Sequence, residues 1–114
     1  MNQDRINKMQ AWIKEIIAPK LIELTAEVQQ DFGIININWV VISKDMSYLD
    51  VFVSSIKNQE NLCKTLALYA QDLKHEINKN ITLRKTPIIR FRYDKTNETT
   101  LNLISKIHAL EINE

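Results

Sequence analysis

The chain has 114 residues, of which 45% are hydrophobic, and a formal net charge of +1. This length predicts one domain over 1–114 and leaves no room for a second core. A single cysteine, Cys63, excludes an internal disulfide, and the polar start lacks the apolar run of a signal peptide or a membrane span. We therefore expect the protein to lie in a reducing compartment. By elimination, this compartment is the cytoplasm.

The N-terminal region, 1–31, carries apolar residues at helical spacing and is predicted to be helical. Pro19 interrupts this pattern. Because an interior proline removes a backbone donor, we expect either a kink or two helices with Pro19 in the first turn of the second. The helical region should end near Gly33, the only glycine of the chain, since helix C-termini favour glycine.

A core region, 34–94, follows, and it begins with two predicted strands joined by the polar turn 43–47. In the first strand, 34–42, the alternation predicts that Trp39 and Val41 face the core together with Ile35 and Ile37. In the second strand, 48–55, the residues predicted to be buried are Leu49, Val51 and Val53. The two strands should form an antiparallel hairpin.

Tyr48 and Phe52 fall on the outward face of the second predicted strand. Aromatic side chains beside arginines can stack on nucleic-acid bases, and they can equally cover a sheet edge. The sequence leaves both interpretations open.

Two further helices are predicted. The first runs from Asn58, a suitable N-cap, to about Asn80, and its apolar stripe is Leu62, Leu66, Tyr69/Ala70, Leu73 and Ile77. The second is a C-terminal helix over 96–112, capped by Thr96 or Asn97, with Leu101, Ile104, Ile107 and Leu110 on its inner face.

Between these helices, residues 83–94 are predicted to form a strand with two different faces. Side chains alternate across a strand, so Pro87, Ile89, Phe91 and Tyr93 should pack on the core while Thr86, Ile88, Arg90 and Arg92 point away. Arginines are planar, always charged and well suited to phosphate recognition. This strand therefore predicts a cationic strip on a small core.

The positive charge is concentrated in one part of the chain. Residues 73–93 hold six cations against Glu76, a local balance of +5, which leaves −4 for the remainder. Such a distribution predicts one oriented, exposed basic patch. The alternative is a solvated helix end next to an edge strand protected by its charges.

Groups that could support catalysis or metal binding do not converge in the sequence. A single glycine cannot form a phosphate-binding loop, and Cys63, His75 and His108 show no metal-ligand spacing. We expect neither an enzyme nor a cofactor or metal site.

Two segments, Val40–Val53 and Leu83–Asp94, together resemble the ribosome-binding factor A family. The first has a valine-rich strand, a serine–basic–aspartate turn and a second strand with alternating valines. The second has a leucine–arginine pair followed by a proline, a phenylalanine and an aspartate at the family's spacing. The similarity covers about residues 34–110 well and the first helix loosely.

The resemblance implies an α+β, KH-like domain of bacterial type II. Its order is α-β-β-α-β-α with a long and kinked second helix, and helices cover one face of a three-stranded mixed sheet. It implies a monomeric, non-catalytic assembly factor that binds free small ribosomal subunits and 16S rRNA, assists late maturation and rRNA processing, and uses neither DNA nor a membrane. The RNA-binding residues implied are Lys74, Lys79, Arg84, Lys85, Arg90 and Arg92, with Lys44 as a weaker candidate.

One departure concerns the kink. The family commonly has alanine-x-glycine within the long helix, and here Gln71 stands where the glycine would fall. Glutamine does not favour a bent backbone.

An alternative function uses the same basic strand in a protein-interaction module that binds an acidic partner.

Overall fold

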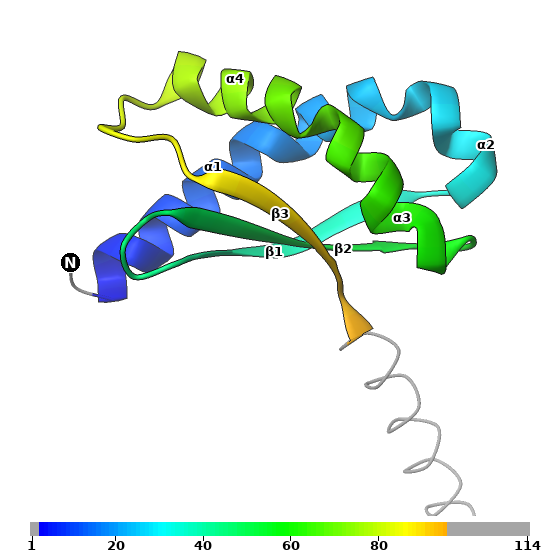
Figure 1. Cartoon of the computed structure of the whole chain (residues 1–114), viewed down its shortest axis with the longest axis horizontal. Coiled ribbons are helices and arrows are strands. Elements are labelled where there is room, and N and C mark those ends of the chain that lie inside the picture. Colours follow the sequence, from blue (N-terminus) through cyan, green and yellow to red (C-terminus); the bar gives the residue numbers. More distant parts are fainter. Residues whose placement is uncertain (1–2, 96–114) are drawn as a thin grey trace, which may run out of the picture.

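The structure, a computed structural model, describes residues 3–95 and follows the predicted order of elements over that range (Figure 1). The N-terminal helices are α1 (Gln3–Leu24), a 3-10 turn η1 (Ala26–Val28) and α2 (Gln29–Phe32). The hairpin strands β1 (Ile35–Ile42) and β2 (Tyr48–Ser55) come next, followed by α3 (Gln59–Leu66), the 3-10 turn η2 (Ala67–Tyr69), α4 (Ala70–Asn80) and β3 (Ile88–Tyr93). The predicted helix 96–112 lies outside the described residues. None of the described helices is long and apolar enough to cross a membrane.

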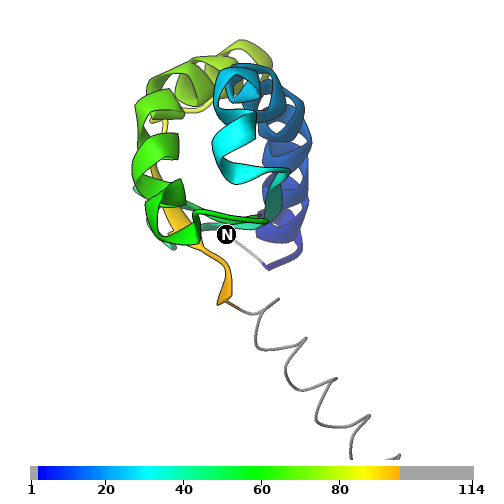
Figure 2. The ribbon, with the colours of Figure 1, turned by 90° about the vertical axis from the view of Figure 1, so that its right-hand side faces the viewer.

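The three strands form one mixed sheet in the order β1-β2-β3. β1 and β2 are antiparallel, as predicted, while β2 and β3 are parallel. The helices pack on one face of this sheet (Figure 2). We call the opposite face, which no helix of residues 3–95 covers, the outer sheet face.

The core lies between the helices and the sheet. The predicted stripes are confirmed, because the side chains of the following residues are fully buried: Ile13, Ile17, Leu49, Val51, Val53, Leu62, Leu66, Leu73 and Ile77. Burial of a side chain of this size contributes about 1.5–3 kcal/mol, so these residues fix the helix layer on the sheet.

The N-terminal helix does not divide at Pro19. α1 continues through Pro19 to Leu24, so of the two expected alternatives, a kink or two helices, the second is wrong. Pro19 lies on the exposed side, while Ile17 and Leu21 on either side of it are buried. The packing of these two side chains offsets the loss of the backbone hydrogen bond that proline cannot make. The helical region ends as predicted at Gly33, which has a φ of 73° and donates its N–H to the Gln29 carbonyl.

A β-bulge in β1 overturns the predicted facing of Trp39 and Val41. Ile37 pairs with Val53 and Trp39 with Phe52, so Asn38 is the extra residue between them. Because one extra residue reverses the alternation, Trp39 and Val41 point to the outer sheet face and are exposed. Ile42 and Val40 are buried in their place.

The long helix is bent, as the family resemblance implies, although Gln71 replaces the glycine. The bend lies at η2, between α3 and α4 (Figure 1). Leu66 and Leu73 are buried on either side of it, and the Tyr69 hydroxyl donates a hydrogen bond to Glu27 at 2.8 Å. Packing on both sides of the bend and this tether therefore hold the kink without a glycine. Asn58 occupies the N-cap of α3 without a side-chain capping hydrogen bond.

The third strand is shorter than predicted. β3 begins at Ile88, and 81–87 forms an irregular connection from α4. The predicted alternation is confirmed over the strand itself: Ile89, Phe91 and Tyr93 pack against the core, while Arg90 and Arg92 lie on the outer sheet face, where both contact Asp50.

Candidate nucleic-acid interface

The seven predicted cations fall into three groups set by the elements that carry them. Lys44, Lys79, Arg84 and Lys85 lie at the end of the molecule where the β1–β2 turn meets the α4–β3 connection. Lys74 lies further back along α4. Arg90 and Arg92 lie on β3, on the outer sheet face. The expectation of one continuous patch is wrong, because α4 and the outer sheet face lie on opposite sides of the sheet.

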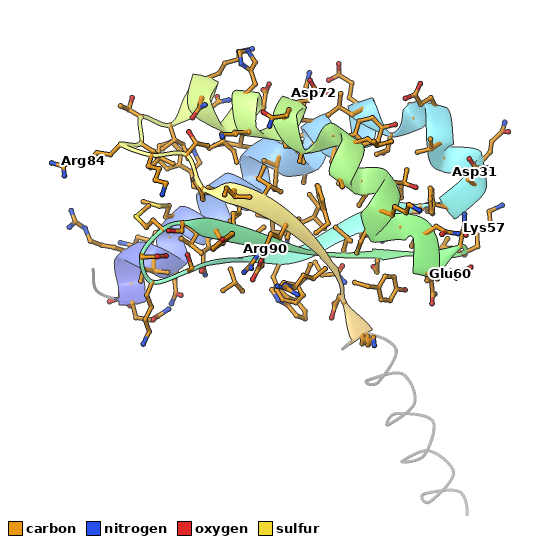
Figure 3. All side chains as sticks on the ribbon, in the orientation of Figure 1. Asp31, Lys57, Glu60, Asp72, Arg84 and Arg90 are labelled. Carbon is orange, nitrogen blue, oxygen red and sulfur yellow. The ribbon has the colours of Figure 1, made fainter. Side chains whose placement is uncertain are left out.

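The first group, which we call the basic end, is assembled from three chain segments. The Ile88 N–H donates a hydrogen bond to the Ser47 carbonyl at 2.8 Å, which joins the α4–β3 connection to the β1–β2 turn. The Thr86 hydroxyl bonds the Asn78 side chain, which joins the same connection to the end of α4. These contacts bring Lys44, Lys79, Arg84 and Lys85 to one end of the domain, and Figure 3 shows Arg84 extending from it.

The four cations of the basic end are available to a ligand. Each is exposed, and none forms a hydrogen bond or ion pair with another residue of the range 3–95. The nearby carboxylate of Asp45 accepts hydrogen bonds from the Ser47 N–H and the Ser43 hydroxyl. These bonds lower the pKa of Asp45 to about 2, so Asp45 orders the turn that carries Lys44.

Side chains of both charges lie at the opposite end of the domain, around α2 and α3. Asp31 and Glu60 extend there, with Lys57 nearby (Figure 3). The charge at this end is therefore mixed, whereas the basic end presents four cations that form no ion pair within residues 3–95, which favours approach to a polyanion with the basic end first.

Arg90 and Arg92 are held in an ion-pair cluster rather than standing free. Arg90 donates from Nε and Nη2 to the two carboxylate oxygens of Asp50 at 2.7 and 3.1 Å, and these bonds raise the pKa of Arg90. Arg92 Nε lies 3.5 Å from the same carboxylate. The Arg90 guanidinium also stacks 4.1 Å above the Tyr48 ring centre.

Two features of this face escaped the sequence prediction. No role for Asp50 is predicted from the sequence, but its register opposite Arg90 makes it the partner of both arginines. Trp39 was expected in the core, and instead its ring lies 5.3 Å from the Phe52 ring. The alternation of β2 could have placed Asp50 outward, whereas no local signal marked the bulge at Asn38.

Among the described residues, no group of three or more histidine, cysteine, aspartate or glutamate side chains could hold a metal ion. Burial raises the pKa of the Cys63 thiol, which disfavours the reactive thiolate. What this part of the molecule offers a ligand is positive charge and aromatic surface.

Comparison with known proteins identifies the family. A family model described as ribosome-binding factor A matches residues 5–107. The chain belongs to the ribosome-binding factor A family. It is 36% identical over 105 residues to ribosome-binding factor A of Thermosipho africanus, covering 87% of this chain and 82% of that protein. It is also 28% identical over 120 residues to the Finegoldia magna protein of the same name, covering 100% and 99%.

Solved structures of ribosome-binding factor A have the same fold. The crystal structure of the Thermus thermophilus protein superimposes with a TM-score of 0.69 at 20% identity, covering 77% of this chain and 93% of that one. A solution structure from Thermotoga maritima, described as a putative ribosome-binding factor A, gives a TM-score of 0.62 at 27% identity, covering 81% and 90%. The predicted α+β, KH-like type II fold with a three-stranded mixed sheet is confirmed.

Family membership also confirms the broad functional prediction. The chain is a ribosome-binding factor of a non-catalytic family rather than a small enzyme. The seven predicted contact residues remain predictions.

Proposed function

We propose that this chain is a cytoplasmic, single-domain assembly factor that binds free small ribosomal subunits through 16S rRNA. In this role it assists late subunit maturation and rRNA processing as a monomer without a cofactor. A homology model of Thermus thermophilus ribosome-binding factor A, fitted into the cryo-electron-microscopy map of its complex with the 30S subunit, shares this fold, with a TM-score of 0.63 at 21% identity. That relative supports the choice of the small subunit.

The observation that carries the proposal is the basic end. Lys44, Lys79, Arg84 and Lys85 are exposed, come from three chain segments and meet no acid among the described residues. Cations presented in this way displace counterions from an RNA backbone, and the release of these ions drives binding. Because phosphate contacts carry no sequence information, specificity would come mainly from RNA shape.

Lys74, Arg90 and Arg92 have a secondary role in this proposal. Lys74 is half-buried on α4, and the two arginines share the Asp50 carboxylate. That pairing also favours the second candidate function, the binding of an acidic protein partner, since it shows that the strand arginines can bind a carboxylate.

The test is cosedimentation with free small subunits over a series of salt concentrations. The double variant Arg84→Glu/Lys85→Glu should bind more weakly than the native chain. Its logarithmic salt dependence should be shallower by about one unit for each phosphate that the variant no longer neutralises. Both side chains are exposed on an irregular connection, so the fold should persist, which circular dichroism would check.

A matched control makes the same charge change at the opposite end of the domain. Lys57→Glu/Lys64→Glu reverses two exposed cations near α3 and should leave the salt dependence unchanged. Equal effects of the two double variants would refute the basic end as the contact surface. Binding that survives complete nuclease digestion of the rRNA would instead support the acidic protein partner.

A further inference from the structure

The outer sheet face carries aromatic and cationic side chains in register. Trp39, Phe52 and Arg92 form one row across the three strands, because Trp39 pairs with Phe52 and Phe52 with Arg92. Val41, Asp50 and Arg90 form the next row. Successive rows on one face of a sheet are about 6.8 Å apart, the rise of two strand residues.

The first row presents an aromatic surface to solvent. The Trp39 and Phe52 rings lie 5.3 Å apart and are tilted by 31°, and Trp39 is 38% exposed. A tryptophan directed away from the core loses the burial that usually stabilises this residue. The bulge at Asn38 is what directs it outward.

The charge that this face presents is positive, although its formal charges balance. The side chains of Arg90 and Arg92 are 39% and 51% exposed, whereas that of Asp50 is 20% exposed. Asp94, the other carboxylate, is 2% exposed and accepts a hydrogen bond from Asn38. A ligand approaching the face therefore meets guanidinium groups before carboxylates.

Within residues 3–95, the guanidinium groups keep donors free for such a ligand. Each has five N–H donors. Arg90 uses Nε and Nη2 toward Asp50, and Arg92 reaches that carboxylate only at 3.5 Å. Arg92 stands opposite Phe52 in the sheet register, so a phosphate bound there would lie beside a base stacked on the aromatic pair.

From these observations we infer that the outer sheet face is a second RNA site, which binds a single-stranded segment. One base stacks on Trp39 and Phe52, and Arg92 contacts its phosphate. Aromatic side chains stack on bases of any sequence, and only an unpaired base can reach such a platform. This inference rests on the proposed function, because it concerns how the same protein holds RNA.

The test uses tryptophan fluorescence. The chain has two tryptophans, and Trp12 is 50% exposed on α1, so Trp12→Phe leaves Trp39 as the only reporter. A short oligouridine should quench this signal saturably, and an RNA duplex of the same length should not. Trp39→Ala should weaken oligouridine binding about 5- to 150-fold, the range measured for loss of one stacked base.

Two further variants guard against unfolding as the cause. Trp39→Phe keeps an aromatic ring and should recover most of the affinity. Val41→Ala removes an exposed apolar side chain from the same face and should leave the affinity unchanged. Thermal melting of each variant confirms that it is folded.

Several outcomes would overturn the inference. The first is that Trp39→Ala and the native chain bind oligouridine with equal affinity. The second is that quenching of Trp39 fluorescence by oligouridine appears only after removal of residues 96–114. The third is that the fluorescence is quenched as protein concentration rises, without RNA. The second assigns the face to the C-terminal segment and the third to another copy of the chain. Cosedimentation with small subunits that persists in Trp39→Ala, and is lost only in Arg84→Glu/Lys85→Glu, would leave the proposed function intact in each case.

Discussion

Replacing Asn38 with alanine tests whether the bulge is held by its side chain. The Asn38 amide donates to the Asp94 carboxylate at 2.5 Å and to the Ser54 hydroxyl at 3.3 Å. It thereby ties the bulge in β1 to the residue that follows β3, across the central strand. Asn38→Ala removes both bonds and leaves a carboxyl that is 2% exposed without this donor.

The expected destabilisation follows from the two bonds. A hydrogen bond to a buried carboxyl contributes about 1.5–3 kcal/mol, and the longer bond to a hydroxyl about 0.5 kcal/mol, so Asn38→Ala should cost about 2–3.5 kcal/mol. The entropy of unfolding is about 2.1 cal/mol/K per residue, or about 0.24 kcal/mol/K for this chain, so the melting temperature should fall by about 8–15 °C.

The assay is thermal unfolding followed by far-ultraviolet circular dichroism, with urea unfolding as a second measurement. Asn36→Ala is the matched control, because Asn36 is an exposed asparagine on the same strand, and its effect should stay within about 0.5 kcal/mol. Ser54→Ala removes only the weaker bond and should fall between the two. If Asn38→Ala were no more destabilising than Asn36→Ala, the idea that Asn38 holds the bulge would be refuted.

Three other predictions concern the turns and the ion-pair cluster. Gly33→Ala should cost about 1–3 kcal/mol in urea unfolding, because the φ of 73° disfavours a side chain and the added Cβ would lie 3.1 Å from the Ile56 Cβ; an unchanged midpoint would contradict this. Asp50→Asn should strengthen RNA binding and steepen its salt dependence by about one unit, since it frees the charge of Arg90 and Arg92; an unaltered slope would argue against the outer sheet face as an RNA site. The Asp45 pKa of about 2 lies below its ordinary 3.8, so its stabilising effect is complete above about pH 4 and is lost as the pH falls toward 2. Urea midpoints measured between these pH values should fall less in Asp45→Asn than in the native chain, and parallel curves would show that this carboxylate is not responsible.

Side-chain periodicity predicted most of the fold because the buried positions dominate its energetics. The alternation of β2 is confirmed, and so is the stripe of the bent helix apart from Tyr69 and Ala70, which are half-buried, since Leu62, Leu73 and Val51 are fully buried. At Pro19 the buried positions of the helix outweigh the local preference of the proline. A proline usually ends or kinks a helix, but here the neighbouring buried side chains hold α1 continuous.

The site was predicted less well because it depends on register rather than composition. The exposed cations of the basic end could be named from sequence, but their meeting required the contacts between the β1–β2 turn and the α4–β3 connection. Periodicity also predicts an uninterrupted alternation through Asn38, and this prediction wrongly places Trp39 in the core. One extra residue reverses every later side chain of a strand, and a bulge leaves no mark in the hydrophobic pattern.

The parallel pairing of β2 with β3 has a kinetic consequence. The two strands are joined by the connection 56–87, which includes both segments of the bent helix, so their contacts close a long loop that is costly to form early in folding. The contacts within the hairpin and those between α1 and β1 are shorter in range, so these elements can assemble while the remainder is still being synthesised. Arg90 and Arg92 therefore reach Asp50 and the aromatic row only in the last stage, and a partly folded chain would compete poorly for RNA.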